Sequence, residues 1–123
     1  MKNLFWVSLG GVLGANARYL LDGWIAAWLG PAFPYGTLVI NVSGSMILGI
    51  LYGVLEARTL SPVLRLVVGI GFLGAYTTFS TFTYETIRLV EDGSLLRAFV
   101  YVAGSVLTGL AAVFLGLATG RLV

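Results

Sequence analysis

The 123-residue sequence contains no cysteine and no histidine. The absence of cysteine excludes disulfide bonds, thiolate metal sites and thiol nucleophiles. The absence of histidine removes the commonest general base, metal ligand and pH switch, which leaves five Asp and Glu residues as candidate acids. Together these two absences argue against an enzyme.

Charged side chains are also scarce. Asp, Glu, Lys and Arg make up 10% of the chain, against about 25% in an ordinary soluble domain, while 59% of it is hydrophobic. At this length ~30% or more of the surface stays exposed after folding, and so few charges cannot cover it. The sequence therefore predicts a protein whose solvent is the lipid bilayer. Its seven Lys and Arg residues lie scattered at segment ends and form no basic stripe, which argues against nucleic acid as a partner.

Long apolar runs divide the chain into segments of membrane length, for which a helix needs ~20 mainly apolar residues. Four such runs, separated by short segments rich in turn formers or charge, lie at about 4–29, 36–55, 62–88 and 95–118. We expect an all-α membrane protein in which residues 1–123 form a single four-helix transmembrane domain. Lys2, the apolar residues 4–13 and Ala15-Asn16-Ala17 superficially match a secretory signal, but cleavage there would leave a helix remnant starting at Arg18. A retained first helix is the better interpretation.

Positive charges are divided almost evenly between the two ends of the predicted bundle. One end has Lys2, Arg58, Arg65 and Arg121, and the other has Arg18, Arg88 and Arg97. Because the Lys and Arg asymmetry of short loops sets the orientation of a membrane protein, this near-balance predicts insertion in both orientations. With so few charges, chance alone gives such a balance about as readily.

Seventeen glycines, about twice the usual share, include three pairs at close-packing spacing: Gly10 and Gly14, Gly49 and Gly53, and Gly116 and Gly120. Small faces let helix backbones approach each other, and van der Waals contact at such faces drives helix association in lipid. Four helices carry more of these faces than one chain is expected to pair internally, which predicts a homo-oligomer. The simpler alternative is that glycine is common in membrane helices.

The third predicted span is unusually polar. Glycines at 69, 71 and 74 precede the run Tyr76-Thr77-Thr78-Phe79-Ser80-Thr81-Phe82-Thr83-Tyr84-Glu85-Thr86. Hydroxyls within the bilayer must face other helices, backbone carbonyls or water. Glycine followed by hydroxyl residues, in a span longer than the bilayer requires, predicts a helix that is broken near the membrane midplane. The alternative is an unbroken helix whose hydroxyls join the bundle together.

Phe79 and Phe82 are three residues apart and therefore share one helical face. Aromatic rings turned edge-on offer weak positive potential to an anion without a formal charge that would trap it. Asn41 and the hydroxyls add hydrogen-bond donors. Such a path favours a small anion that accepts strong hydrogen bonds. The alternative is that both phenylalanines are ordinary core residues.

Three motifs resemble those of a known family: Gly10-Gly11-x-x-Gly14-Ala15-x-x-Arg18-Tyr19, Pro34-Tyr35-Gly36-Thr37-Leu38-x-x-Asn41-x-x-Gly44 and Gly71-Phe72-x-Gly74-x-x-Thr77-Thr78-Phe79-Ser80-Thr81-Phe82. In order and spacing they resemble the Fluc (CrcB-type) fluoride channels of microbes, and the resemblance spans nearly the whole chain. It implies an antiparallel dual-topology homodimer with two fluoride pores. It also implies a structural sodium ion at the centre of the interface, bound by backbone carbonyls at the break in the third helix.

The resemblance further implies roles for single residues. The fluoride pore would contain Asn41, Phe79, Phe82, Ser80, Thr81, Tyr101 and Ser105. The vestibule would contain Arg18, Thr37 and Glu85, and the sodium ligands would be the backbone carbonyls of Gly74 and Thr77. Ala75 departs from the family pattern, which often has a second glycine there, and this leaves the local geometry of the break open.

The function that follows is passive, fluoride-selective export of cytoplasmic fluoride across the cell inner (plasma) membrane. The runner-up is a small dimeric proton-coupled exporter, which would need a deeply buried carboxylate in mid-span. A purely structural membrane protein would not require the cluster of hydroxyls and phenylalanines. Two charged residues have simpler interpretations as well: Arg18 with Asp22 as an interfacial pair, and Glu85 as the partner of Arg88.

Overall fold

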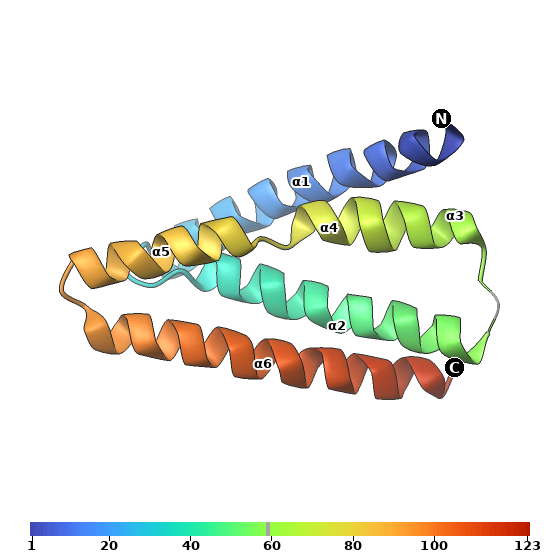
Figure 1. Ribbon diagram of the computed structural model, residues 1–123. Coiled ribbons are helices and arrows are strands. Elements are labelled where there is room, and N and C mark those ends of the chain that lie inside the picture. Colours follow the sequence, from blue (N-terminus) through green and yellow to red (C-terminus); the bar gives the residue numbers. More distant parts are fainter. Residues whose placement is uncertain (59) are drawn as a thin grey trace.

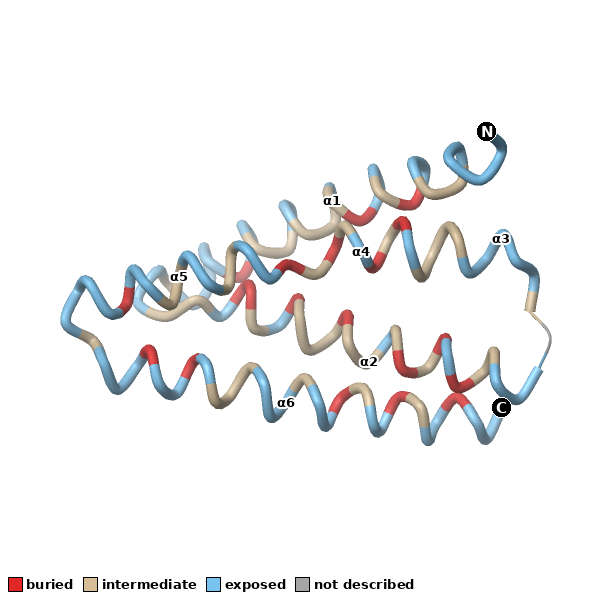
Figure 2. Tube along the Cα trace, viewed as in Figure 1, coloured by how far each residue is buried: buried red, intermediate tan, exposed pale blue. Residues whose placement is uncertain are grey.

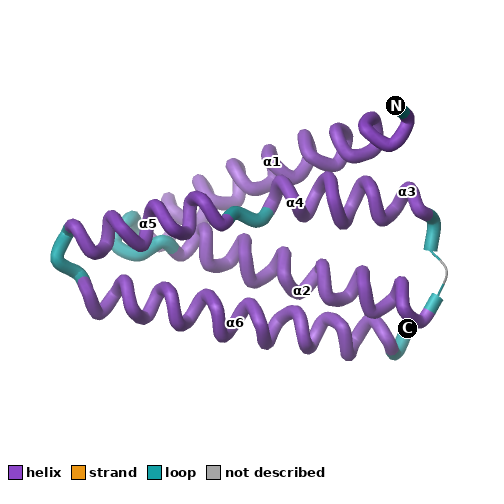
Figure 3. Tube along the Cα trace, in the orientation of Figure 1, coloured by secondary structure: helices purple, strands orange, loops and turns teal. Residues whose placement is uncertain are grey.

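The computed structural model describes residues 1–58 and 60–123, and the regular structure in these ranges is entirely helical (Figure 3). Its elements are α1 (Lys2–Leu29), α2 (Tyr35–Ala57), α3 (Pro62–Leu64), η1 (Arg65–Phe72), α4 (Leu73–Tyr76), α5 (Phe79–Glu91) and α6 (Leu95–Arg121). Four helical segments, Lys2–Leu29, Tyr35–Ala57, Pro62–Glu91 and Leu95–Arg121, are long and apolar enough to cross a membrane. The prediction of an all-α chain with four membrane-length helices is confirmed, and the segment bounds differ from the expected ranges by only a few residues.

The four segments run up and down the bundle, so both chain termini lie at one end, beside the start of α3 (Figure 1). The connections from α1 to α2 and from α5 to α6 lie at the opposite end (Figure 1). Gly30 and Gly93 in these two connections have φ angles of 79° and 73°. This left-handed conformation costs glycine little because it has no Cβ, and it lets the chain reverse direction after α1 and after α5.

The third segment is the least regular part of the bundle. Pro62 stands in its first turn, where the missing N–H of proline is harmless, and two π-helical turns follow over η1 before α4. Thr77 and Thr78 then adopt extended conformations and separate α4 from α5, as the short loop between these labels shows in Figure 3. The π-helical turns were not predicted. They include Gly71, whose backbone meets that of α1.

Two glycine seams hold the helices together at the end of the bundle that carries the termini. They are formed by all three predicted pairs, Gly10 and Gly14, Gly49 and Gly53, and Gly116 and Gly120. The first pair faces the backbone of η1, and the other two pairs face each other across α2 and α6. A Cβ on any of these glycines would overlap the backbone of the neighbouring helix. All three pairs are therefore used within the chain, whereas a Cβ on Gly23, Gly74 or Gly104 would meet nothing within 4 Å, so the homo-oligomer stays a prediction.

Few residues are buried, and those that are lie on the inward sides of the helices (Figure 2). Two small clusters form the core: Ile40 with Leu73 and Tyr76, and Leu89 with Ala98 and Tyr101. Large apolar side chains elsewhere are exposed, including Trp24, which is stacked on Trp28 in α1. So much exposed apolar surface is unfavourable in water but suits contact with lipid.

Candidate functional site

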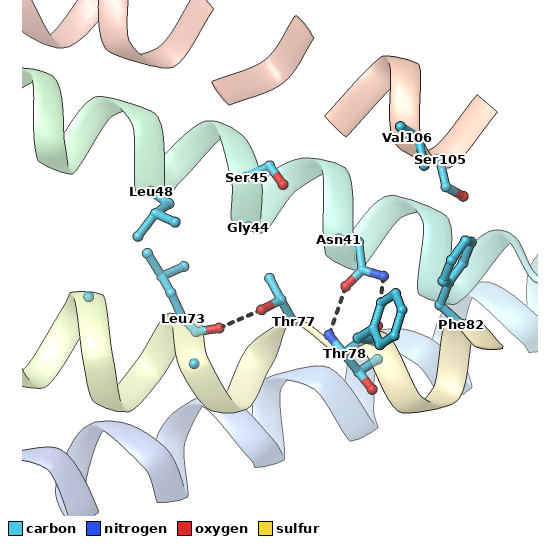
Figure 4. A pocket seen from close by; sticks show the side chains of 13 residues that line it. Asn41, Gly44, Ser45, Leu48, Leu73, Thr77, Thr78, Phe82, Ser105 and Val106 are labelled. Carbon is cyan, nitrogen blue, oxygen red and sulfur yellow. Dashed lines mark hydrogen bonds between the residues drawn. The ribbon is translucent and has the colours of Figure 1, made fainter. Parts of the chain in front are cut away.

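A groove of about 390 Å³ lies beside the interruption between α4 and α5, with walls from α2, α4, α5 and α6 (Figure 4). Of the residues predicted for the pore, Asn41, Phe79, Phe82 and Ser105 line this groove. The predicted sodium ligands Gly74 and Thr77 line it too. The predicted pore residues Ser80, Thr81 and Tyr101 are not among its lining residues. The fold thus brings six of the predicted residues to one place.

Asn41 of α2 holds the interrupted backbone. Its Oδ1 accepts a hydrogen bond from the Thr78 amide at 2.8 Å, and its Nδ2 donates to the Thr78 carbonyl at 3.0 Å (Figure 4). One side chain therefore satisfies both backbone groups of a non-helical residue, which would be costly to leave unpaired away from water. Asn41 combines two properties: it lines the groove, and it braces the interruption.

The interruption releases backbone carbonyl oxygens from helical bonding, among them those of Gly74 and Thr77. In a continuous α-helix the Gly74 carbonyl would accept from the Thr78 amide, and the Thr77 carbonyl would accept from the Thr81 amide. Here the Thr78 amide donates to Asn41, and the Thr81 amide donates to Thr78 Oγ1 at 3.2 Å. The Gly74 and Thr77 carbonyls therefore lack their helical partners at residues that line the groove. Among the described residues no cluster of carboxylates could hold a metal ion.

Hydroxyls of the Ser- and Thr-rich run mostly satisfy their own backbone. Thr77, Thr83 and Thr86 each donate to a carbonyl three or four residues earlier, at 2.8 to 3.0 Å. Thr78 Oγ1 caps α5 by accepting from the amide of Thr81. These threonine hydroxyls bond within their own segment, whereas the Tyr76 hydroxyl of the same run joins α4 to Ser43 of α2.

Phe79 and Phe82 share one wall of the groove. Their ring centroids are 5.9 Å apart, with the ring planes at 43°. Phe79 is 77% exposed in the single chain, which contradicts the alternative that both rings are core residues. Phe82 is half-buried and its ring lies 5.1 Å from that of Tyr101. The two rings therefore form one aromatic wall, in which Phe82 packs against Tyr101 and Phe79 is exposed.

Ser105 brings a hydroxyl to the groove from α6 (Figure 4). Its Oγ is buried and has no hydrogen-bond partner within residues 1–58 and 60–123. Burying an unpaired hydroxyl costs free energy, so this group gains from a ligand that accepts its hydrogen bond. Ser105 is thus an available donor.

A second groove, of about 430 Å³, opens at the end of the bundle opposite the termini, and Glu85 lines it. The Glu85 carboxylate accepts hydrogen bonds from Thr37 Oγ1 at 2.9 Å and from the Tyr101 hydroxyl at 2.7 Å. One carboxylate therefore ties α5 to both α2 and α6. Arg88 contacts Glu91 at 3.1 Å instead of Glu85, so the simpler interpretation of Glu85 as the partner of Arg88 is wrong.

Within residues 1–58, Arg18 and Asp22 are not paired with each other, although their spacing on α1 predicts an ion pair. Arg18 is half-buried on α1 and lines neither groove, so its place in the vestibule stays a prediction. An ion pair between Arg18 and Asp22 is not found within the described part of the chain. Asp22 instead lies against Gly36, in the first turn of α2.

Sequence reasoning assigned no role to three residues: Thr78 and Asp22, which each line a groove, and Tyr76, which lines neither. Thr78 lines the first groove and caps α5, and a threonine directly before a helical run is a recognisable cap. The Tyr76 hydroxyl and Ser43 Oγ form a hydrogen bond of 2.9 Å. Residues so far apart in sequence show no local pattern, so only the folded chain reveals this contact.

Comparison with known proteins identifies the family. A family model described as CrcB-like protein, Camphor Resistance (CrcB), matches residues 5–117. A protein of Acidobacterium capsulatum named fluoride-specific ion channel FluC is 50% identical over 122 residues, which cover 98% of this chain and 97% of that one. Proteins of the same name from Geobacter metallireducens and Magnetococcus marinus are 49% and 48% identical, over 98% and 96% of this chain and 98% and 97% of theirs. The resemblance that the three motifs carried is confirmed, and the chain belongs to the CrcB-like family.

Proposed function

We propose that this protein is a fluoride-selective channel through which cytoplasmic fluoride leaves the cell passively across its inner membrane. The observation that carries the proposal is the near-half identity, over almost the whole chain, to proteins named fluoride-specific ion channels. Hydrogen fluoride is a weak acid that crosses membranes as a neutral molecule and releases its anion inside. A cell whose interior is negative therefore expels fluoride through a selective pore without fuel.

The first groove has the chemistry that such a pore needs. Its described lining includes no Lys or Arg, so no fixed positive charge traps the anion. The edges of the Phe79 and Phe82 rings offer weak positive potential, and the unpaired Ser105 hydroxyl offers a hydrogen bond. Asn41 adds a second N–H, since its Nδ2 carries two hydrogens and one is used on Thr78. Several weak neutral donors let a small anion bind and leave quickly.

A second, antiparallel copy completes the path in this proposal. Phe79 and Gly74 are exposed in one chain, so the groove is open on the side of the interruption. The near-equal numbers of Lys and Arg at the two ends suit insertion in both orientations. A twofold axis in the membrane plane then generates two pores per dimer. Because the glycine seams are used within each chain, other faces form the interface.

The third helix is, in this proposal, broken near the membrane midplane, where Gly74 and Thr77 would hold a structural sodium ion. The interruption at Thr77 and Thr78 lies halfway along the segment Pro62–Glu91, which supports this depth. The freed carbonyls are neutral oxygen ligands, and Ala75 removes none of them because the ligands belong to the backbone. When bound, the ion supplies positive charge that balances the carbonyl dipoles of the two copies.

The decisive experiment measures ion efflux from liposomes that contain the purified protein, comparing fluoride with chloride while proton gradients are clamped. We expect fluoride efflux that greatly exceeds chloride efflux and does not depend on a proton gradient. The Glu85→Gln variant should remain uncoupled from protons, since a channel has no obligatory protonation step. Fluoride movement that requires a proton gradient and is abolished in Glu85→Gln would replace the channel with the exporter.

Dual topology has its own test, made simple because the chain contains no cysteine. A single cysteine added after Val123 would be labelled in intact cells by a membrane-impermeant thiol reagent. Insertion in both orientations predicts that about half of the molecules react. Complete labelling, or none, would contradict the antiparallel dimer while leaving the fluoride flux assay unaffected. Dimer stability in detergent should also fall when sodium is replaced by a large organic cation.

A further inference from the structure

A contact between α1 and α2 places a carboxylate against the backbone at the second groove. Asp22 lies so close to Gly36 that a Cβ on this glycine would overlap the carboxylate, and it would lie 3.0 Å from Cγ. Gly36 is buried and Asp22 is half-buried. The absence of a side chain at position 36 is therefore what admits Asp22 to this place.

The first turn of α2 has no side-chain cap of its own. The residue before the helix is Pro34, and no side chain caps the helix end by a hydrogen bond. The amides of a first turn carry partial positive charge, so a carboxylate beside them is stabilising. α2 has no acidic residue in its own first turn, and two carboxylates from other helices lie against it: Asp22 at Gly36 and Glu85 at Thr37.

The turn that Asp22 contacts leads directly to the aromatic wall. Thr37, which follows Gly36, is 1% exposed and donates to Glu85. Glu85 also accepts from Tyr101, which is 1% exposed and lies against the ring of Phe82. Thr37 and Tyr101 are fully enclosed, so a displacement of Thr37 is passed on to the side chains that it contacts. The connected contacts span all four membrane-length helices.

We propose that Asp22 is a positioning residue of the fluoride path. It fixes the first turn of α2 by packing on Gly36, and it acts through Thr37, Glu85 and Tyr101 on the orientation of Phe82. The inference rests on the proposed function, because its readout is fluoride flux. It assigns no contact between Asp22 and the anion.

The test compares fluoride and chloride efflux per folded dimer for Asp22→Asn, Asp22→Ala, Gly36→Ala and the double variant Asp22→Ala with Gly36→Ala. Asp22→Asn keeps the shape but loses the charge, and we expect a roughly two- to fivefold lower fluoride rate, about the factor that a charge at a helix end contributes. Gly36→Ala pushes the carboxylate out and should lower the rate more than tenfold. The double variant removes the overlapping carboxylate and should recover part of that loss.

Two controls separate positioning from general damage. Glu56→Gln removes a carboxylate at the opposite end of the bundle, and Gly23→Ala adds a methyl where nothing lies within 4 Å. Both should keep the parent rate. In a Thr37→Val background, Asp22→Ala should add less than a twofold further loss, because the route through Thr37 is already cut.

The fluoride-to-chloride ratio supplies a readout that reduced stability alone would not change. We expect this ratio to fall in Asp22→Asn, since a displaced Phe82 alters the path and not the number of folded dimers. Parent-like rate and ratio in both Asp22 variants, or full additivity with Thr37→Val, would overturn the inference while the parent still conducts fluoride. A parent protein that carries no fluoride would instead refute the proposed function.

Discussion

The two ends of the bundle are held together in different ways. At the end with the termini, glycines bring helix backbones into direct contact, both between α1 and η1 and between α2 and α6. At the other end and toward the middle, side chains make the connections, through Asn41 on Thr78 and through Glu85 on Thr37 and Tyr101. The second groove lies at this end, and the first groove lies beside the interruption at the middle of the bundle.

This difference shows in which part of the bundle an anion path between the helices can exist. Backbones in contact leave no space between helices, whereas helices joined by side chains stand further apart and expose polar groups between them. Contacts between glycines are also insensitive to charge, while the side-chain network contains groups that an anion can meet. The glycine half therefore supplies rigidity, and the polar half supplies the path. Four predictions test this division.

The largest effect is expected from methyl groups in a glycine seam. The double variant Gly116→Ala with Gly120→Ala places two Cβ atoms into the backbone of α2. Overpacking costs about 2 kcal/mol per site, so we expect the free energy of unfolding to fall by about 4 kcal/mol. Thermal unfolding in detergent, followed by helical circular dichroism, measures the loss.

The matched control lies in the same helix. A methyl group added at Gly104 would meet nothing within 4 Å, and one added at Gly109 would make only an ordinary contact at 3.8 Å. Since alanine also favours a helix more than glycine does, the double alanine variant at these two positions should be at least as stable as the parent. Equal destabilisation by both pairs would show that helix flexibility, and not backbone contact, makes the seam.

The next effect concerns the brace of the interruption. Asn41→Ala leaves the amide and carbonyl of Thr78 without partners, which should cost about 3 kcal/mol of stability. Asn41→Asp turns a donor toward the Thr78 carbonyl into an acceptor and adds a fixed negative charge, so fluoride efflux should fall more than tenfold. Asn16→Ala is the control, because the Asn16 amide bonds only to Val12 of its own helix. Unchanged stability and flux in both Asn41 variants would remove Asn41 from the site.

A smaller effect is expected from the aromatic wall. Phe79→Ile and Phe82→Ile keep apolar bulk but lose the ring edge, an interaction of about 1 kcal/mol, so fluoride efflux should fall roughly fivefold in each. The two variants should differ in stability: Phe82 packs on Tyr101, whereas Phe79 is exposed in the single chain. Parent-like flux in folded, dimeric forms of both would place the path elsewhere.

The smallest effect on stability is expected from an ion pair at the end of the bundle with the termini. It is a contact between side chains at the end where glycine contacts otherwise hold the helices. Arg121 Nε contacts a Glu56 carboxylate oxygen at 2.7 Å, and both side chains are more than half exposed. Exposed pairs contribute little, so Arg121→Gln should leave the thermal midpoint of unfolding unchanged within error. A clear loss of stability would mean that the glycine end also depends on polar side chains.

The four membrane-length helices could be predicted from the sequence because bilayer thickness dictates the length of each apolar run. The composition of the third segment also pointed to the region around Thr77 and Thr78, since glycine and hydroxyl residues both weaken a continuous helix. These are local properties. They need no knowledge of which helices are neighbours.

Features that depend on neighbours could not be predicted in the same way. The clamp of Asn41 on Thr78 joins residues 37 positions apart, and nothing in either local sequence specifies the other. The spacing of Arg18 and Asp22 puts both on one face of α1, but the rotation of that helix, set by its glycine seam on η1, sends Asp22 to Gly36. Which helix face packs against which other face is known only once the helices are packed together.

The interruption in the third segment also bears on biogenesis. At ~1.5 Å per residue, the stretch from Pro62 to Tyr76 is ~22 Å long and α5 is ~20 Å long, whereas the hydrocarbon core is ~30 Å thick. Neither half crosses a bilayer alone, so the two must leave the insertion machinery as one unit. The Thr78 backbone then needs Asn41 at once, and because α2 is synthesised before the third segment, its brace is already in the membrane when the interruption arrives.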